Sequence, residues 1–267
     1  MPRNREAVFR TGPLSRGPVR GLLAALFWLA VWQLAAVAVG EELLVPPPLT
    51  VARTLGGLMG SLPFWQAAGA SLLRIGAGFA AAVAAGGLLA ALTVRFRAAD
   101  LLISPLLRTI RAIPVASFII LLLVWVRTDI LPAAAAFLMV MPVVWGNVEK
   151  GFRSVDGSLL EMARVFRFGT ARTLTRVRIP SVMPYFLSAC TTGLGLAWKS
   201  GIAAEVIARP LLSIGKELQD AKVYLETAEM FAWTLVVAVL SLLLEKLLVS
   251  AARRFGRRWG AAGDTTA

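Results

Sequence analysis

The sequence contains no histidine and a single cysteine, Cys190. Without histidine, the chain lacks the commonest general base, proton relay and metal ligand. One cysteine cannot form an intrachain disulfide, and no metal-ligand spacing is present, so we expect no metal site. Cys190 lies within an apolar run, where we expect it to act as a small packing residue.

Charge is also scarce. Only 16% of the residues are charged and 58% are hydrophobic, and the mean hydropathy is +0.74. This composition predicts an all-α integral membrane protein. Uncharged runs that approach or reach the roughly 20 residues needed to span a bilayer indicate about six transmembrane helices, at 21–39, 75–94, 112–126, 130–148, 179–198 and 230–244.

The positive charges predict the topology. With a cytoplasmic N-terminus and six spans, 21 of the 28 Lys and Arg residues fall on the cytoplasmic side, which is the bias of the positive-inside rule. We therefore expect a multi-pass membrane protein with a cytoplasmic tail at 1–20, a membrane domain at 21–250 and a second cytoplasmic tail at 251–267. The first apolar run is long for a signal peptide, which favours an uncleaved anchor.

The net charge of +13 has other consequences. The basic residues suit contact with anionic lipid headgroups. They do not form the aromatic-interleaved basic motif of a nucleic-acid binder, so we expect no nucleic-acid partner.

One predicted cytoplasmic loop, 149–180, carries seven of the basic residues. Ser158 and Glu161 have capping-box spacing, which predicts a short helix from there to about Phe166. Leu159, Ala163 and Phe166 would share one apolar face of it, and Gly169 would break it. Such a helix fits either docking into a partner protein or resting on lipid headgroups.

The same loop resembles the EAA loop of ATP-binding-cassette (ABC) importer permeases, E-A-A-x3-G-x9-I-x-L-P. Glu161-Met162-Ala163 and Val177-Arg178-Ile179-Pro180 match its two ends at the family spacing. The motif's glycine falls at Arg167, with Gly169 two residues later, which predicts a displaced turn. The stretches SLLRIGAGF at 71–79 and GLAWKSGIAAEVI at 195–207 resemble the nitrate/sulfonate/taurine-type permeases, and this likeness covers about residues 43–250.

The resemblance implies the MetI-like fold of type I importers, and a transport subunit rather than an enzyme. Its partners would be a cytoplasmic ATPase that binds the ATP, an external solute-binding protein and a second permease copy. The chain has no GxxxxGK[ST] phosphate loop and should bind no ATP or other cofactor itself. Coupling to the ATPase would rest on the loop residues Ser158, Glu161, Ala163, Arg164, Arg167, Gly169 and Pro180.

The fifth run holds the candidate pathway residues. Lys199 is a charge within a span, where charges are costly and usually functional. Ser188 and Thr192 lie on the same helix face, so we hypothesise a pathway face that attracts anions; pairing or snorkelling of Lys199 is the alternative. Glu205 matches a family glutamate and is a candidate part of an external gate, with Arg74 or Arg209 as its partner.

Small residues recur every four positions in the second and fifth runs, which indicates close helix packing or a pathway lining. The sequence leaves other functions open. An intramembrane enzyme would need a nucleophile–base pair or metal ligands, which are not visible. A stand-alone carrier would show acidic residues at mid-membrane and inverted halves, which are not visible either. Nitrate, sulfonates, taurine or a vitamin precursor would fit as solute, and a homodimer or a heterodimer would fit as assembly.

Overall fold

The computed structural model describes residues 18–258, so most of the predicted tail 1–20 and the last nine residues of the tail 251–267 lie outside the described residues. The described part is helical, without strands. Its elements are α1 (Pro18–Val39), α2 (Pro48–Met59), α3 (Leu62–Arg95), α4 (Arg97–Ala112), α5 (Val115–Leu122), α6 (Leu131–Arg153), α7 (Gly157–Val165), α8 (Thr170–Thr173), the π-helix η1 (Leu174–Arg178), α9 (Ile179–Ala208), α10 (Ile214–Val223) and α11 (Thr227–Arg258).

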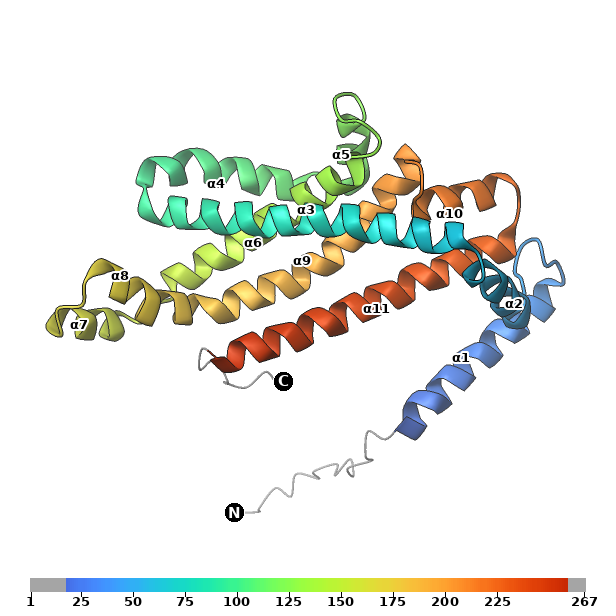
Figure 1. The fold of residues 1–267 in the computed structure, drawn as a ribbon, viewed down its shortest axis with the longest axis horizontal. Helices are drawn as coiled ribbons and strands as arrows, with labels where there is room; N and C mark the ends of the chain where they lie inside the picture. The colour runs from blue at the N-terminus through green and yellow to red at the C-terminus, as the bar shows by residue number, and fades with distance from the viewer. Residues whose placement is uncertain (1–17, 259–267) are drawn as a thin grey trace, which may run out of the picture.

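The long helices α3, α6, α9 and α11 run along the same axis (Figure 1). Helix α6 packs most extensively against α3 and α9. The short helices α7 and α8 lie at one end of the molecule, and α2 and α10 lie at the other, so we refer to the α7 end and the α10 end (Figure 1). Helix α9 starts at the α7 end and ends at the α10 end, so one continuous helix joins the two.

Small residues form the contacts between these helices. Gly78 of α3 lies so close to α6 that a Cβ there would come within 2.2 Å of the Ala133 carbonyl oxygen. The buried stripe of α3 is Gly78, Ala82, Gly86 and Ala90, and that of α9 is Ala189, Gly193, Ala197 and Gly201. The predicted four-residue stripes therefore pack helix against helix, and the alternative that they line a pathway is wrong.

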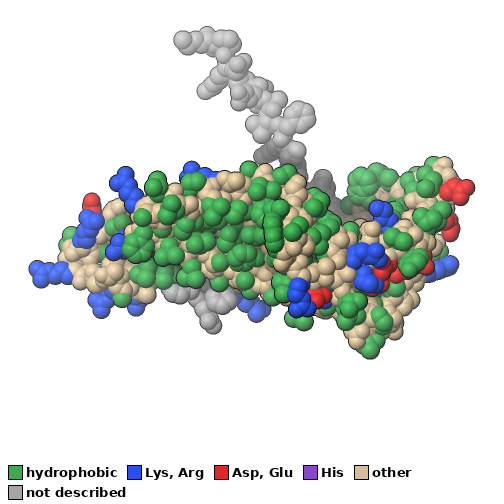
Figure 2. All heavy atoms as spheres, turned by 90° about the horizontal axis from the view of Figure 1, so that it is seen from above, with side chains coloured by type: hydrophobic (Ala, Val, Ile, Leu, Met, Phe, Trp, Pro, Cys, Tyr) green, Lys and Arg blue, Asp and Glu red, His purple; other side chains and the backbone are tan. Residues whose placement is uncertain are grey.

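Hydrophobic side chains cover the middle of the molecule on the face shown in Figure 2, whereas Lys and Arg gather at the α7 end and both signs of charge at the α10 end. Four described helices, α1, α3, α6 and α11, are long and apolar enough to cross a membrane, and the bent pair α4–α5 would make a fifth. Helix α9 has 30 residues, which at 1.5 Å rise per residue is roughly 45 Å and long enough to span a bilayer. It is not among the described helices that are both long and apolar enough to do so, so four or five spans stand against the predicted six.

The predicted span at 112–126 is not one continuous helix. In its place, α4 and α5 meet at an angle of 106°. The cause is Pro114, which has no backbone N–H and disfavours helical dihedrals in the residue before it; Ile113 accordingly has φ −78° and ψ 131°. The other five predicted runs each coincide with a helix, namely α1, α3, α6, α9 and α11.

Candidate functional site

The segment between α6 and α9 begins with helix α7, which is capped by Asp156. The Asp156 carboxylate accepts a hydrogen bond of 2.9 Å from the Ser158 backbone N–H. The predicted capping box is therefore wrong, because Ser158 lies inside the first turn and Glu161 lies too far along to reach back. Asp is a strong N-cap, and its charge interacts favourably with the positive end of the helix dipole.

Helix α7 ends in a Schellman motif centred on Arg167. The Arg167 N–H donates to the Arg164 carbonyl (2.9 Å), and the Phe168 N–H donates to the Ala163 carbonyl (2.8 Å). This pattern requires a left-handed residue, usually glycine, and Arg167 adopts it with φ 51°. The predicted displacement of the turn to Gly169 is wrong, since the left-handed residue lies at the position of the motif's glycine.

Gly169 has a different role from the predicted helix breaker. Its dihedrals, φ −65° and ψ 162°, are open to any residue, and it is the N-cap of α8. A Cβ at Gly169 would meet nothing within 4 Å. The turn therefore depends on position 167, where the chain has no glycine.

The side chains of α7 divide between a buried and an exposed side. Ala163 is 2% exposed, and α7 contacts η1, whose buried residue is Val177. The predicted face of Leu159, Ala163 and Phe166 is thus split, because Ala163 points inward. Glu161 and Met162 are exposed, as are Val165 (79%) and Phe166 (68%). The arginines at 164, 167, 172, 176 and 178 are exposed as well.

The connection to α9 passes through the π-helix η1. Its defining bond runs from the Ile179 N–H to the Leu174 carbonyl, five residues earlier. Pro180 follows as the second residue of α9. A proline ring crowds the carbonyl four residues before it and offers no N–H, so a wider turn just ahead of it is expected. Pro180 therefore sets how the α7–α8 segment joins α9.

Three of the four predicted pathway residues lie together. Ser188, Thr192 and Lys199 are exposed on α9, on the side opposite the buried small-residue stripe. None of the ion pairs within the described part of the chain includes Lys199. Glu205 does not belong to this face, because it is fully buried.

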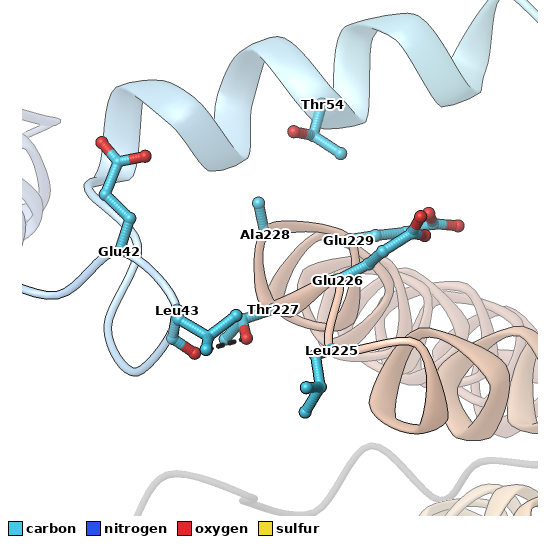
Figure 3. A pocket seen from close by; sticks show the side chains of 8 residues that line it. All are labelled: Glu42, Leu43, Thr54, Leu225, Glu226, Thr227, Ala228 and Glu229. Atoms are coloured by element: carbon cyan, nitrogen blue, oxygen red, sulfur yellow. Dashed lines mark hydrogen bonds between the residues drawn. The ribbon is translucent and has the colours of Figure 1, made fainter.

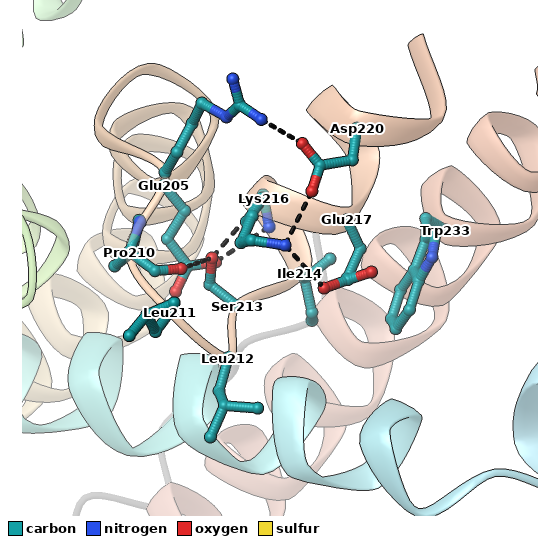
Figure 4. A network of polar contacts seen from close by, with 12 residues as sticks. Glu205, Pro210, Leu211, Leu212, Ser213, Ile214, Lys216, Glu217, Asp220 and Trp233 are labelled. Carbon is teal, nitrogen blue, oxygen red and sulfur yellow. Dashed lines mark hydrogen bonds and ion pairs between the residues drawn. The ribbon is translucent and has the colours of Figure 1, made fainter. Parts of the chain in front are cut away.

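Glu205 instead joins α9 to α3 and α10 at the α10 end, and Figure 4 shows it beside the start of α10. Its Oε2 accepts hydrogen bonds from the Ser71 hydroxyl (2.8 Å) and the Gly215 N–H (3.1 Å). Its Oε1 lies 3.8 Å from Arg74 Nη1. Of the two predicted partners, Arg74 is therefore the neighbour of Glu205, whereas Arg209 pairs with Asp220.

Asp220 also anchors a small ion cluster on α10. Lys216 Nζ donates to Asp220 over 2.7 Å. This hydrogen bond raises the pKa of Lys216 and lowers the pKa of Asp220. Lys216 also lies 3.5 Å from Glu217. The cluster keeps the carboxylates of α10 occupied with partners on the helix itself or on the preceding loop.

A cavity of about 400 Å³ opens at the α10 end, between the α1–α2 connection and the start of α11 (Figure 3). Its polar lining includes the carboxyl groups of Glu42, Glu226 and Glu229. The Thr227 hydroxyl closes one side by donating to the Leu43 carbonyl (2.6 Å). Acidic residues in the lining make this cavity unfavourable for an anion.

Comparison with known proteins explains the arrangement. Residues 82–260 match the family model described as "Binding-protein-dependent transport system inner membrane component". The chain belongs to this family. It is the membrane-embedded, multi-pass permease component of an ABC importer, of the nitrate/sulfonate/taurine type, with the MetI-like fold. The resemblance in the 149–180 loop is thereby confirmed at the level of the family.

Several relatives match over nearly their whole length. A Bacillus subtilis protein named for aliphatic sulfonates transport is 27% identical, covering 92% of this chain and 90% of the relative. The taurine transport system permease of Escherichia coli is 28% identical, covering 91% and 90%. The bicarbonate transport system permease of Synechococcus elongatus is 27% identical, covering 86% of each.

A solved structure shares the fold. It is a chain of the crystal structure of an amino acid ABC transporter with histidines, with a TM-score of 0.56, 18% identity, and coverage of 70% of this chain and 90% of that chain. This likeness supports the fold and says nothing about the solute.

Two structural residues were missed by the sequence reasoning. Asp156 lies two positions before Ser158 and is an equally good N-cap by type, so the sequence offered both. Ser71 opens the family-like SLLRIGAGF stretch, but its contact was not readable from the sequence, because a serine in an apolar helix usually bonds its own backbone. Here its hydroxyl donates to Glu205, 134 positions away.

Proposed function

We propose that this permease works with an ATPase at its α7 end and a solute-binding protein at its α10 end, as one of two permease copies in a bacterial inner membrane. The α7 end would be cytoplasmic, as would both termini. The ATPase would bind the ATP, and this chain would hold no cofactor. The charge distribution supports this orientation, since the described basic residues gather at the α7 end.

The observation that carries the docking proposal is the build of the α7–α9 segment. Helix α7 exposes Met162, Val165 and Phe166 next to exposed arginines. Apolar anchors within a basic rim suit a groove on a soluble protein as well as anionic lipid headgroups, and the match to the binding-protein-dependent transport family favours the protein partner. On its other side, α7 rests on η1, which continues into α9. A displacement of α7 would therefore be transmitted to α9 through the buried Ala163 and through η1, which joins α9 just before Pro180.

Site-specific photocrosslinking tests the docking. A photoreactive residue at Val165 (79% exposed) should form an adduct with the ATPase subunit in native membranes. The matched control is Leu88, which is 67% exposed but lies on the apolar surface of α3; it should crosslink only to lipid or membrane chains. Adducts of Val165 with lipid alone would show that α7 rests on the bilayer, which would contradict docking.

The proposed solute is a small anion such as a sulfonate, taurine, nitrate or bicarbonate. Lys199 carries this proposal. It is an exposed ammonium group on a membrane helix, about two to three helical turns beyond the exposed, hydroxyl-bearing Ser188 and Thr192 on the same face. A charge left facing hydrocarbon would be costly, so this face of α9 would meet water or the second permease copy. Relatives named for sulfonates, taurine and bicarbonate add support.

Uptake by right-side-out vesicles from cells that express the whole transport system tests the role of Lys199. Taurine, an aliphatic sulfonate, nitrate and bicarbonate would each be offered. Lys199→Ala should reduce uptake of the transported anion at least roughly tenfold, and Lys199→Arg should restore most of it. The control is Arg53→Gln, on the exposed surface of α2. Unchanged uptake by Lys199→Ala would refute the anion pathway while leaving the docking proposal intact.

A further inference from the structure

The corner where α9 turns into α10 is held by buried polar contacts from α3. Glu205 is fully buried near the end of α9, and Ser71, also fully buried, contributes its hydroxyl from α3. The Ser71 hydroxyl donates to Glu205 Oε2 and accepts from the Ile214 N–H (3.0 Å). Three helices therefore meet in one hydrogen-bonded unit.

This unit satisfies the first turn of α10. The opening N–H groups of a helix have no partner within the helix. Here Ile214 donates to Ser71, Gly215 to Glu205 Oε2 (3.1 Å) and Lys216 to the Ser213 hydroxyl (3.1 Å). Two of the three acceptors come from other helices. Glu205 also places a negative charge at the positive end of the α10 dipole.

Arg74 and Gly215 complete the fit. Arg74 lies on α3, about one helical turn after Ser71. It donates to the carbonyls of Leu211 (2.8 Å) and Leu212 (3.0 Å) in the loop before α10. A Cβ at Gly215 would lie 2.3 Å from Glu205 Cβ and 2.5 Å from the Val206 nitrogen. Only glycine allows α10 to approach the carboxylate this closely. Figure 4 shows Glu205 beside the start of α10.

We propose that Glu205 is a positioning residue that caps α10 from outside, and that Glu205, Ser71 and Arg74 make α10 a fixed part of the wall at this end rather than a mobile lid. We call these three residues the clasp. The two hydrogen bonds accepted by Glu205 Oε2 stabilise the clasp most, because without that acceptor the Ser71 hydroxyl and the Gly215 N–H would be buried without a partner. The inference does not depend on the solute or on the ATPase.

Amide hydrogen exchange of the full chain in detergent tests the clasp at residues 213–217. Glu205→Ala should raise exchange there by roughly tenfold or more, because two buried donors lose their acceptor. Glu205→Gln should stay within roughly threefold of the wild type, since one amide oxygen can accept both hydrogen bonds. Gly215→Ala should also raise exchange, by forcing α10 away from Glu205. The control is Glu217→Gln, which changes a half-exposed carboxylate on α10 outside the clasp.

Amide exchange of residues 131–145 in α6 reports whether the fold is intact and should be as slow as in the wild type. If Glu205→Ala also speeds exchange in α6, Ser71→Ala replaces it as the test variant. Ser71→Ala removes only one acceptor and should raise exchange at 213–217 by about threefold. Wild-type exchange at 213–217 in either alanine variant, with α6 intact, would overturn the proposal. So would an effect of Glu205→Gln as large as that of Glu205→Ala.

Discussion

Replacing Arg167 with glycine should tighten the turn after α7. Arg167 is the left-handed residue of the Schellman motif, with φ 51°. The left-handed conformation costs an L-residue about 1–2 kcal/mol, which glycine would avoid. Glycine also makes the unfolded chain more flexible, and this offsets about 0.4–1 kcal/mol of the stabilisation. The net stabilisation of the turn is about 1 kcal/mol, which makes the open form roughly fivefold rarer and amide exchange correspondingly slower.

The assay is amide hydrogen exchange over residues 158–168 of the purified chain. Arg167→Ala is the matched control, because it removes the same charge and side chain while keeping the cost of the left-handed backbone. Gly169→Ala is the second control, since position 169 has ordinary dihedrals and open space for a Cβ. We expect slower exchange in Arg167→Gly than in Arg167→Ala, and little change in Gly169→Ala.

Two results would refute this reasoning. Equal exchange in Arg167→Gly and Arg167→Ala would mean that the left-handed backbone costs nothing at this turn. Faster exchange in Gly169→Ala would mean that position 169 provides the conformational freedom after all.

Two further predictions concern packing and pH. Gly78→Ala should lower the free energy of unfolding by about 1–3 kcal/mol, because the added Cβ would meet the Ala133 carbonyl. The control Gly76→Ala adds a Cβ that meets nothing within 4 Å, so it should be neutral or stabilising. Equal thermal midpoints of the two variants in detergent would contradict this prediction. The pKa of Asp220 is lowered by its hydrogen bond from Lys216, so its ionised form stabilises α10 above pH about 4, and that contribution is lost as the pH falls through the folded-state pKa. The thermal midpoint of Asp220→Asn should thus lie below that of the wild type at pH 6 and converge with it once the pH has fallen through the lowered folded-state pKa of Asp220. A gap that stays constant with pH would count against the ion cluster.

The apolar runs predicted the five longest helices because hydrophobic length is a local property of the sequence. The uncharged run at 112–126 did not reveal the break between α4 and α5, because composition does not determine the backbone dihedrals. Pro114 bends the chain there by steric exclusion of helical dihedrals at Ile113. Helix α9 is longer than the uncharged run at 179–198 and continues past Lys199 to Ala208. In this last part Glu205 finds a buried partner on α3, a long-range contact without a local signature.

The candidate site divides in the same way. The EAA spacing located the α7–α9 segment, since a motif is read directly from residue order. It could not say which residue adopts the left-handed conformation, because the turn is set by hydrogen bonds to Arg164 and Ala163 rather than by glycine content. Ala163 was expected on the exposed coupling face, yet η1 folds back against it, which only the tertiary structure reveals.

The most direct test of the central claim is a purification of the tagged chain from native membranes in mild detergent, with the masses and stoichiometry of the copurified subunits. We expect two permease copies with two ATPase subunits, and loss of the ATPase in Glu161→Arg, which reverses an exposed charge on α7. The same reversal at Glu42, at the opposite end, should leave the ATPase bound. Recovery of the chain without an ATPase, or equal ATPase recovery in Glu161→Arg and the wild type, would contradict docking through α7.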